Sequence, residues 1–151
     1  MTSMTYDTDQ LLHMTQQELD DLFRSVDDPG PIPAGDADGT VIVARDARLE
    51  ETAAKVAHHV AWQGKVFDPG KGELVNKIGP LGSHAVRAKV YLGESWFDGK
   101  PAIILDYSKT SLVAHWIRDE IRQISPGLYL GIVYWQRDRI FNFCLRFPTP
   151  G

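Results

Sequence analysis

The sequence is poor in cysteine, in basic clusters and in long apolar runs, and each scarcity excludes a class of protein. Cys144 is the single cysteine, so an intramolecular disulfide is impossible and a cysteine-rich zinc site is excluded. The net charge is −4 and no basic run occurs, which argues against nucleic acid as a partner. No apolar run approaches the roughly 18 residues of a membrane-spanning helix, so no membrane association is expected.

Signals for export, cofactors and metals are also missing. The first ten residues, MTSMTYDTDQ, contain no charged region followed by an apolar run, so we predict no signal peptide and a cytoplasmic location. The glycines follow turn positions rather than a dinucleotide fingerprint, and no G-x-S-x-G nucleophile elbow occurs. His58 and His59 are adjacent and would point about 100° apart on a helix. We therefore expect neither a cofactor nor a metal.

The remaining sequence describes one domain with an ordinary core. The chain has 151 residues, of which 43% are hydrophobic. We predict a flexible N-terminus over 1–14 and a single barrel domain over 15–151. Helices are expected at 15–25, which begins with the capping box Thr15–Glu18, and at 47–61, which has helical apolar spacing. Residues 27–39, rich in proline, glycine and aspartate, predict a loop.

Runs of strand type fill the rest of the chain. Turn signals such as Asp98–Gly99 separate them. The expected strands lie at 40–44, 62–70, 73–78, 84–92, 101–107 and, as a set of three, 116–147. Consecutive strands of this length predict a mainly β fold (α+β), an antiparallel meander barrel with the N-terminal helices packed against it or capping it. A small closed barrel has room for one small ligand.

The stretch from Trp116 to Phe147 leaves alternatives open. Residues 116–124 alternate as a strand, but isoleucines at 117, 121 and 124 also fit a helix that ends at Pro126. If the phenylalanine-rich face of 139–147 covers the outside, it packs under the helices or in a homodimer interface. The interior would then be polar and would contain Asn142 and Cys144. The other interpretation is an exposed ladder of ion pairs through Arg118 and Glu120.

Short motifs in this region resemble the calycin group of lipocalin-like small barrels, in particular bacterial proteins with a G-x-W-x-G segment. The matching pieces are Trp62–Phe67, Lys100–Tyr107, Arg118–Arg122 and Gly127–Gly131, although the first glycine of the motif is absent and Ala61 directly precedes Trp62. The resemblance implies a lumen that binds a small hydrophobic molecule. In a few such proteins the lumen catalyses cyclisation or isomerisation. Some relatives bind haem through a histidine, for which His84 and His115 are the strand-adjacent candidates here.

The sequence thus predicts a barrel that binds an apolar or aromatic molecule carrying a polar or anionic group. The ligand-binding candidates are Lys89, Tyr91, Trp116, Arg118, Tyr134 and Asn142. One alternative is a cofactor-independent cyclase, isomerase or lyase in which Asp106 and Glu120 move protons. Another is a non-catalytic interaction or assembly protein that forms a dimer.

Overall fold

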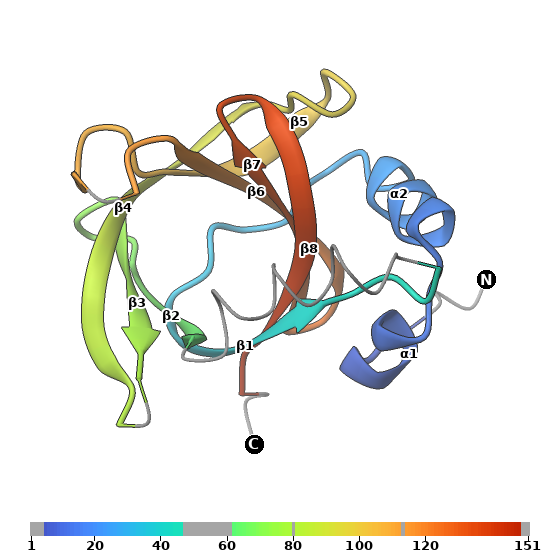
Figure 1. Cartoon of the computed structure of the whole chain (residues 1–151), viewed down its shortest axis with the longest axis horizontal. Helices are drawn as coiled ribbons and strands as arrows, with labels where there is room; N and C mark the ends of the chain where they lie inside the picture. The colour runs from blue at the N-terminus through green and yellow to red at the C-terminus, as the bar shows by residue number, and fades with distance from the viewer. Residues whose placement is uncertain (1–4, 47–61, 80, 113, 149–151) are drawn as a thin grey trace.

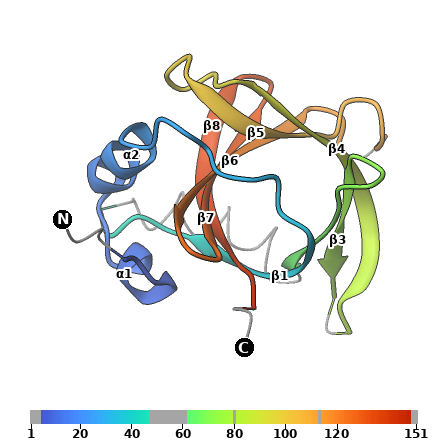
Figure 2. The same cartoon turned by 180° about the vertical axis from the view of Figure 1, so that it is seen from behind.

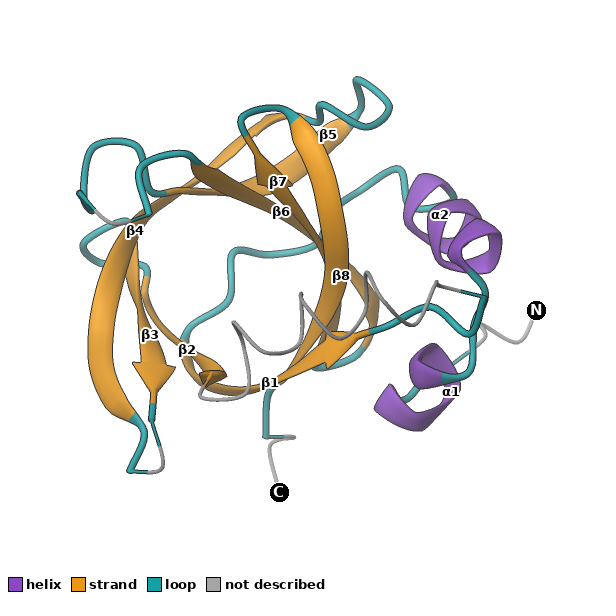
Figure 3. Cartoon of the chain, viewed as in Figure 1, coloured by secondary structure: helices purple, strands orange, loops and turns teal. Residues whose placement is uncertain are grey.

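The chain folds into a closed antiparallel barrel (Figures 1 and 3). The computed structural model describes residues 5–46, 62–79, 81–112 and 114–148. In these ranges each strand pairs with the next in chain order, and the first pairs with the last. The strands are β1 (Gly35–Ile42), β2 (Trp62–Asp68), β3 (Glu73–Ile78), β4 (Ser83–Glu94), β5 (Pro101–Asp106), β6 (Ile117–Ser125), β7 (Leu128–Trp135) and β8 (Asp138–Arg146). The predicted fold class, a mainly β antiparallel meander barrel, is confirmed.

Within the described residues, two short helices pack on one side of the barrel (Figure 1). They are α1 (Thr8–Leu12) and α2 (Gln16–Arg24). The capping box predicted at Thr15 is present, since its hydroxyl accepts a hydrogen bond from the Glu18 amide at 3.1 Å. The prediction of a flexible segment over 1–14 missed helix α1, which Asp7 caps and whose Leu11 is fully buried. The helix predicted at 47–61 lies outside the described residues.

The first strand begins earlier than the sequence suggests. Residues 27–39 were expected to be a loop, but β1 starts at Gly35 and pairs with both β2 and β8. Main-chain hydrogen bonds on both edges hold this glycine- and aspartate-rich segment extended, so tertiary pairing overrides its low strand propensity. The segment before it, residues 25–34, crosses one end of the barrel (Figure 2), where the Tyr129 hydroxyl donates to the Pro31 carbonyl at 2.7 Å.

The three C-terminal strands form as predicted, and residues 117–125 are strand β6 rather than a helix. Gly99 and Gly127 have φ angles of 76° and 73°, the left-handed conformation that suits glycine in tight turns. The turn between β7 and β8 instead places Gln136 and Arg137 at φ 49° and 78°. Residues with side chains rarely adopt this conformation, so the hairpin holds a strained turn.

The barrel has an apolar cluster on each face of its wall. The inner cluster lines the lumen and includes Phe67, Ile103, Leu105 and Leu145. The outer cluster lies between β7, β8 and the helices, and joins Leu19 and Phe23 to residues of β7 such as Leu130 and Ile132. Both faces of the C-terminal strands are therefore buried. This double burial decides where the polar side chains of these strands lie.

Candidate functional site

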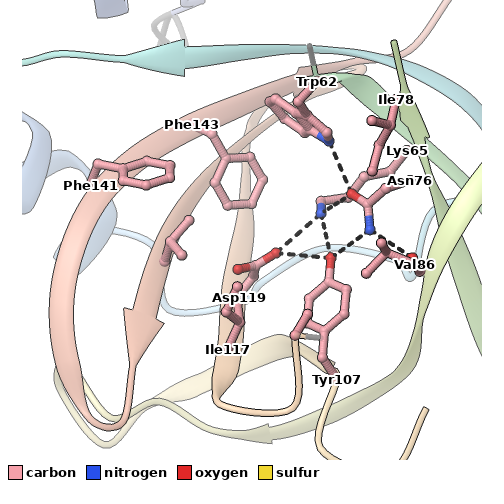
Figure 4. A pocket seen from close by; sticks show the side chains of 12 residues that line it. Trp62, Lys65, Asn76, Ile78, Val86, Tyr107, Ile117, Asp119, Phe141 and Phe143 are labelled. Atoms are coloured by element: carbon pink, nitrogen blue, oxygen red, sulfur yellow. Dashed lines mark hydrogen bonds and ion pairs between the residues drawn. The ribbon is translucent and has the colours of Figure 1, made fainter. Parts of the chain in front are cut away.

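The lumen of the barrel holds a cavity of about 200 Å³ (Figure 4). Aromatic and aliphatic side chains form most of its wall, and four polar side chains meet on one part of it. Its lining residues are Trp62, Lys65, Asn76, Ile78, Val86, Tyr107, Ala114, Ile117, Asp119, Val133, Phe141 and Phe143. A mostly apolar pocket with a few converging polar groups is the usual form of a small-molecule site.

The four polar side chains form one hydrogen-bonded cluster, which we call the lumen cluster: Lys65, Asn76, Tyr107 and Asp119. The Lys65 ammonium donates to the Tyr107 hydroxyl at 2.7 Å and to Asn76 Oδ1 at 2.8 Å, and lies 3.1 Å from Asp119 Oδ2. The Tyr107 hydroxyl accepts from Asn76 Nδ2 at 2.9 Å and donates to Asp119 Oδ2 at 3.4 Å. Each of the four residues is at most 5% exposed.

Four separate elements bring the cluster together. Lys65 comes from β2, Asn76 from β3 and Asp119 from β6, while Tyr107 follows the end of β5. On β2, β3 and β6 these residues alternate with apolar residues on the inner face, so each is a single polar side chain in an apolar row. The cluster exists only in the closed barrel, because β2 and β6 lie far apart around the wall.

A β-bulge in the wall helps to position the side chain of Asn76. The pairing of β3 with β4 shifts register between Val75 and Asn76, which leaves Val86 as the extra residue of a bulge. Val86 has a φ angle of 60°, a genuine outlier for a β-branched residue. Its carbonyl accepts a hydrogen bond from Asn76 Nδ2 at 2.9 Å. The strained bulge thus fixes the amide orientation of Asn76, and Trp62 Nε1 donates to the same residue's Oδ1 at 3.0 Å.

The surroundings of the lumen cluster favour the protonated forms of Lys65 and Tyr107. Burial by itself lowers the pKa of Lys65, but the interactions with Tyr107 and Asp119 outweigh it and raise the pKa above 10.5. Burial raises the pKa of Tyr107 above 10.0, against the opposing effect of Lys65. At neutral pH the cluster therefore contains a protonated ammonium and a neutral phenol. Because Lys65 pairs with Asp119 at 3.1 Å, the two formal charges cancel within the cavity wall.

Aromatic rings surround the ammonium and extend the site from the polar cluster to the apolar wall. Lys65 Nζ lies 5.3 Å from the Trp62 ring centre and 5.4 Å from that of Phe143. These distances suit cation–π attraction. The two rings meet edge to face with their centres 5.7 Å apart. An aromatic ligand placed here would contact rings on its faces and hydrogen-bonding groups at one end.

The sequence prediction placed the site on the wrong face of the wall. Phe141 and Phe143 point into the lumen, so the alternate residues of β8 and the matching residues of β6 point outward. The predicted polar interior with Asn142 and Cys144 is therefore wrong. The phenylalanines also do not form the outer face on which a dimer interface was expected. Polar residues such as Asn142 and Glu120 can lie buried on the outer face because α2 and the loop after β4 donate hydrogen bonds to them.

Glu120 and Arg118 lie together outside the barrel. Glu120 is fully buried beneath the loop that follows β4, where it accepts from Ser95 Oγ at 2.6 Å and from the Trp96 amide at 2.7 Å. Arg118 donates to Glu120 at 3.1 Å and packs its guanidinium 4.2 Å from the centre of the Trp96 ring. These contacts anchor the loop to β6, and neither residue lines the lumen. The exposed ladder considered as an alternative is also wrong, because the pair is covered.

Asp106, Tyr91 and Lys89 also lie on the outer face. The Tyr91 hydroxyl donates to Asp106 at 2.9 Å, and Lys89 binds Glu73 at 2.9 Å. Burial alone would raise the pKa of Asp106, but hydrogen bonds from Ser108 and Tyr91 outweigh it and lower the pKa. A carboxylate held ionised outside the lumen is a poor general acid. The predicted catalytic roles of Asp106 and Glu120 in the lumen are thus corrected.

The three remaining predicted residues have contacts of their own outside the lumen. The Tyr134 ring packs against Trp96 with centres 5.3 Å apart. Asn142 accepts from Gln16 of α2 at 2.9 Å and donates to the Gly131 carbonyl at 3.0 Å, which ties the helix to the barrel. Trp116 is half exposed and lies against His115, with ring centres 4.3 Å apart. In the described ranges, no group of three histidine, cysteine, aspartate or glutamate residues could hold a metal ion.

Two members of the lumen cluster, Asn76 and Asp119, do carry a signal in the sequence, although their meeting with Lys65 and Tyr107 does not. Asp119 stands between Ile117 and Ile121 on one face of its strand, and Asn76 stands between Leu74 and Ile78. A single polar residue in an otherwise apolar row is expensive to bury and indicates a site. The prediction instead relied on rows with many charges, such as the row through Arg118 and Glu120, and these rows lie on the covered outer face.

Comparison with known proteins supports the fold but not a function. No protein-family model matches the sequence, and no curated protein matches it. Over the described ranges, no helix combines the length and apolar character of a membrane span. A solved structure of a protein from Thermomonospora curvata is similar, with a TM-score of 0.60 and 19% sequence identity over 91% of this chain and 90% of that one. At 19% identity, this likeness shows that the two chains share the barrel fold.

Proposed function

We propose that the barrel binds a small, mostly apolar molecule, aromatic in character, with one neutral polar group. The observation that carries the proposal is the lumen cluster, buried at the wall of a cavity of about 200 Å³ whose other walls are aromatic and aliphatic. A buried ion pair contributes little to stability compared with apolar packing. Buried charged groups with shifted pKa values at the wall of a cavity are therefore candidates for a functional site. We therefore retain the apolar or aromatic ligand that the sequence predicts, but propose that the lumen cluster binds it instead of the residues predicted from the sequence.

The charge of the site favours a neutral polar group over the anionic group that the sequence allowed. Asp119 already balances Lys65, so a ligand carboxylate would bring an uncompensated charge into a buried site. A hydroxyl or carbonyl needs only a hydrogen-bond partner. Tyr107 can offer one by turning its hydroxyl away from Asp119, which at 3.4 Å is its longest contact in the cluster. A phenol or a small cyclic ketone has this chemistry.

The size of the cavity limits the ligand to a small molecule. A dry cavity of about 150 Å³ in another protein holds benzene, and the lumen here measures about 200 Å³.

We also propose that the protein acts in the cytoplasm, where a buried single cysteine such as Cys144 stays reduced. The net charge of −4 supports a small molecule rather than a nucleic acid as the partner.

Titration with p-cresol, monitored through the NMR signals of the backbone amides, tests the proposal. We expect saturable shifts at residues around the lumen, such as Lys65, Asn76 and Phe143. Y107F removes one hydrogen-bonding group and should weaken binding by about fivefold, the equivalent of about 1 kcal/mol.

The matched control is Y134F, which removes a tyrosine hydroxyl on the outer face of the barrel and should leave the affinity for p-cresol unchanged. Shifts confined to the outer face, no saturation at all, or equal losses in Y107F and Y134F would each contradict binding in the lumen. Urea unfolding of both variants confirms that each remains folded.

A second candidate function is acid–base catalysis without a cofactor, as a cyclase, isomerase or lyase. The observation that favours it is an acid and a base on one cavity wall, since the Tyr107 hydroxyl lies 3.4 Å from Asp119 Oδ2. Asp119 would remove a proton from the carbon next to a ligand carbonyl. The carbon–hydrogen electron pair would form the enol double bond, and Tyr107 would protonate the carbonyl oxygen.

Exchange at cyclohexanone deuterated beside its carbonyl tests this chemistry. We expect the protein to speed the replacement of deuterium by solvent hydrogen, because enolisation and its reversal exchange that position. D119N should abolish the acceleration, since an amide cannot accept the proton, while D106N on the outer face should keep it. Exchange no faster than in buffer would leave binding as the function of the lumen.

A further inference from the structure

Two strand glycines face the lumen and are not required by their backbone conformation. Gly131 lies in the interior of β7 and Gly39 in β1, and neither has the left-handed φ angle seen at turn glycines such as Gly99. Glycine within a strand costs stability relative to alanine, since it restrains the unfolded chain least and packs no side chain. Their presence therefore indicates a need for space.

Aromatic rings of the cavity wall occupy that space. A Cβ atom on Gly131 would lie 2.3 Å from Cζ and 2.4 Å from Cε1 of Phe143, its direct partner on β8. A Cβ atom on Gly39 would lie 2.3 Å from Cη2 of Trp62. Real Cβ atoms do not approach other atoms this closely, so each ring occupies the space that a Cβ on its glycine would need.

The structure assigns a size-selecting role to the contacts of Gly39 with Trp62 and of Gly131 with Phe143. The glycines let the two rings lie back far enough to admit a ligand with one ring, and the rings exclude larger ligands. The inference deepens the proposed function and rests on it. Both rings line the cavity, and the two contact each other edge to face. With either ring pushed off its glycine, the free direction is inward, toward Lys65 and the space that a ligand would occupy.

The two sides of the contact predict opposite effects on ligand size. G131A keeps an allowed backbone but lifts the Phe143 ring into the lumen, which makes the cavity smaller. F143V removes the ring and enlarges the same space. The double variant G131A/F143V has no ring for the new methyl group to displace, so it should regain the binding that G131A loses.

The experiment measures the affinities of p-cresol, with one ring, and 2-naphthol, with two fused rings, for the full chain. We expect the unmodified protein to prefer p-cresol. G131A should weaken p-cresol by about tenfold, a loss typical of a change of one methyl group in an apolar pocket. F143V should bring 2-naphthol to the affinity of p-cresol or better, and G131A/F143V should bind p-cresol more tightly than G131A.

G93A is the matched control, because Gly93 is also a strand glycine without a left-handed φ, and its added Cβ would meet Ile104 on the outer face, 2.9 Å from Cγ1. It should not change the ratio of the two affinities. If p-cresol binds but the ratio is the same in all variants, the size-selecting role is overturned and the proposed function stands. If neither probe binds in the lumen of the unmodified protein, the proposed function itself fails.

Discussion

Lys65 shows how one residue can be both costly and well supported. Lys65 is 3% exposed, and burial of an unpaired charge would be strongly unfavourable. Three partners at 2.7–3.1 Å compensate it, and one of them, Asp119, carries the opposite charge. Replacement of such a pair by apolar side chains is often neutral or stabilising. The barrel therefore has a cheaper way to fill this space, and the retained pair supports a role in binding.

The same residues predict that the protein loses stability at alkaline pH. The pKa of Tyr107 is raised above 10.0 by burial, and that of Lys65 above 10.5 because its partners outweigh burial. The folded state therefore keeps protons that the unfolded chain releases near pH 10. The stability contributed by these groups is complete below that pH and is lost as the pH rises through the folded pKa values.

Urea unfolding at about pH 8 and about pH 11 measures this loss. We expect Y107F to lose less of its free energy of unfolding over this interval than the unmodified protein, because one shifted group is gone. Burial also raises the pKa of Tyr129 and Tyr134 to about 12, so part of the loss should remain in the variant. An identical loss in Y107F and the unmodified protein would show that Tyr107 is not shifted.

At the scale of elements, a second buried ion pair joins α2 and the loop after β4 to the barrel. Arg122 of β6 is fully buried and binds both oxygens of Asp98 at 2.7 Å, and it also donates to the Phe23 carbonyl at 3.0 Å. Burial alone would raise the pKa of Asp98, but the hydrogen bonds from Arg122 lower it. The contacts hold a helix, a loop and a strand around one guanidinium.

D98N should lower the free energy of unfolding by about 3 kcal/mol at neutral pH, because it leaves the buried Arg122 without its counter-charge. The control D27N removes an exposed pairing with Lys100 and should cost less than about 1 kcal/mol. Since the pKa of Asp98 is lowered on folding, its contribution is present above the unfolded value near 3.8 and is lost as the pH falls. A cost for D98N as small as that for D27N would contradict the role of the pair.

Element boundaries were easier to predict than element faces. Turn signals such as Asp98–Gly99 located the hairpins, and the capping box at Thr15 located α2. The prediction of which residues face the lumen failed in β6. There Glu120 points outward but is fully buried, and Asp119 points inward and is 3% exposed. Alternation reports the inner face only when the other face meets water, and here the helices and the loop after β4 cover it.

At the scale of the whole molecule, local patterns could predict the kind of fold but not the location of the site. Strand length, spacing and turn chemistry are local, and together they predicted a closed meander. The lumen cluster joins residues from β2, β3 and β6 with Tyr107, and these meet only through barrel closure. A single sequence holds no record of such distant pairing, so the cluster required the three-dimensional arrangement. Whether the protein forms a dimer stays a prediction.

The pairing of β1 with β8 also determines the order of events during synthesis. β1 is made first, yet one of its edges finds its partner only when β8 exists. Until then both β1 and β7 present an unpaired edge, which is the kind of surface that templates aggregation between chains. Closure is also a contact of very long sequence separation, which slows folding. A nascent chain of this protein therefore keeps two unpaired strand edges until the last strand is complete.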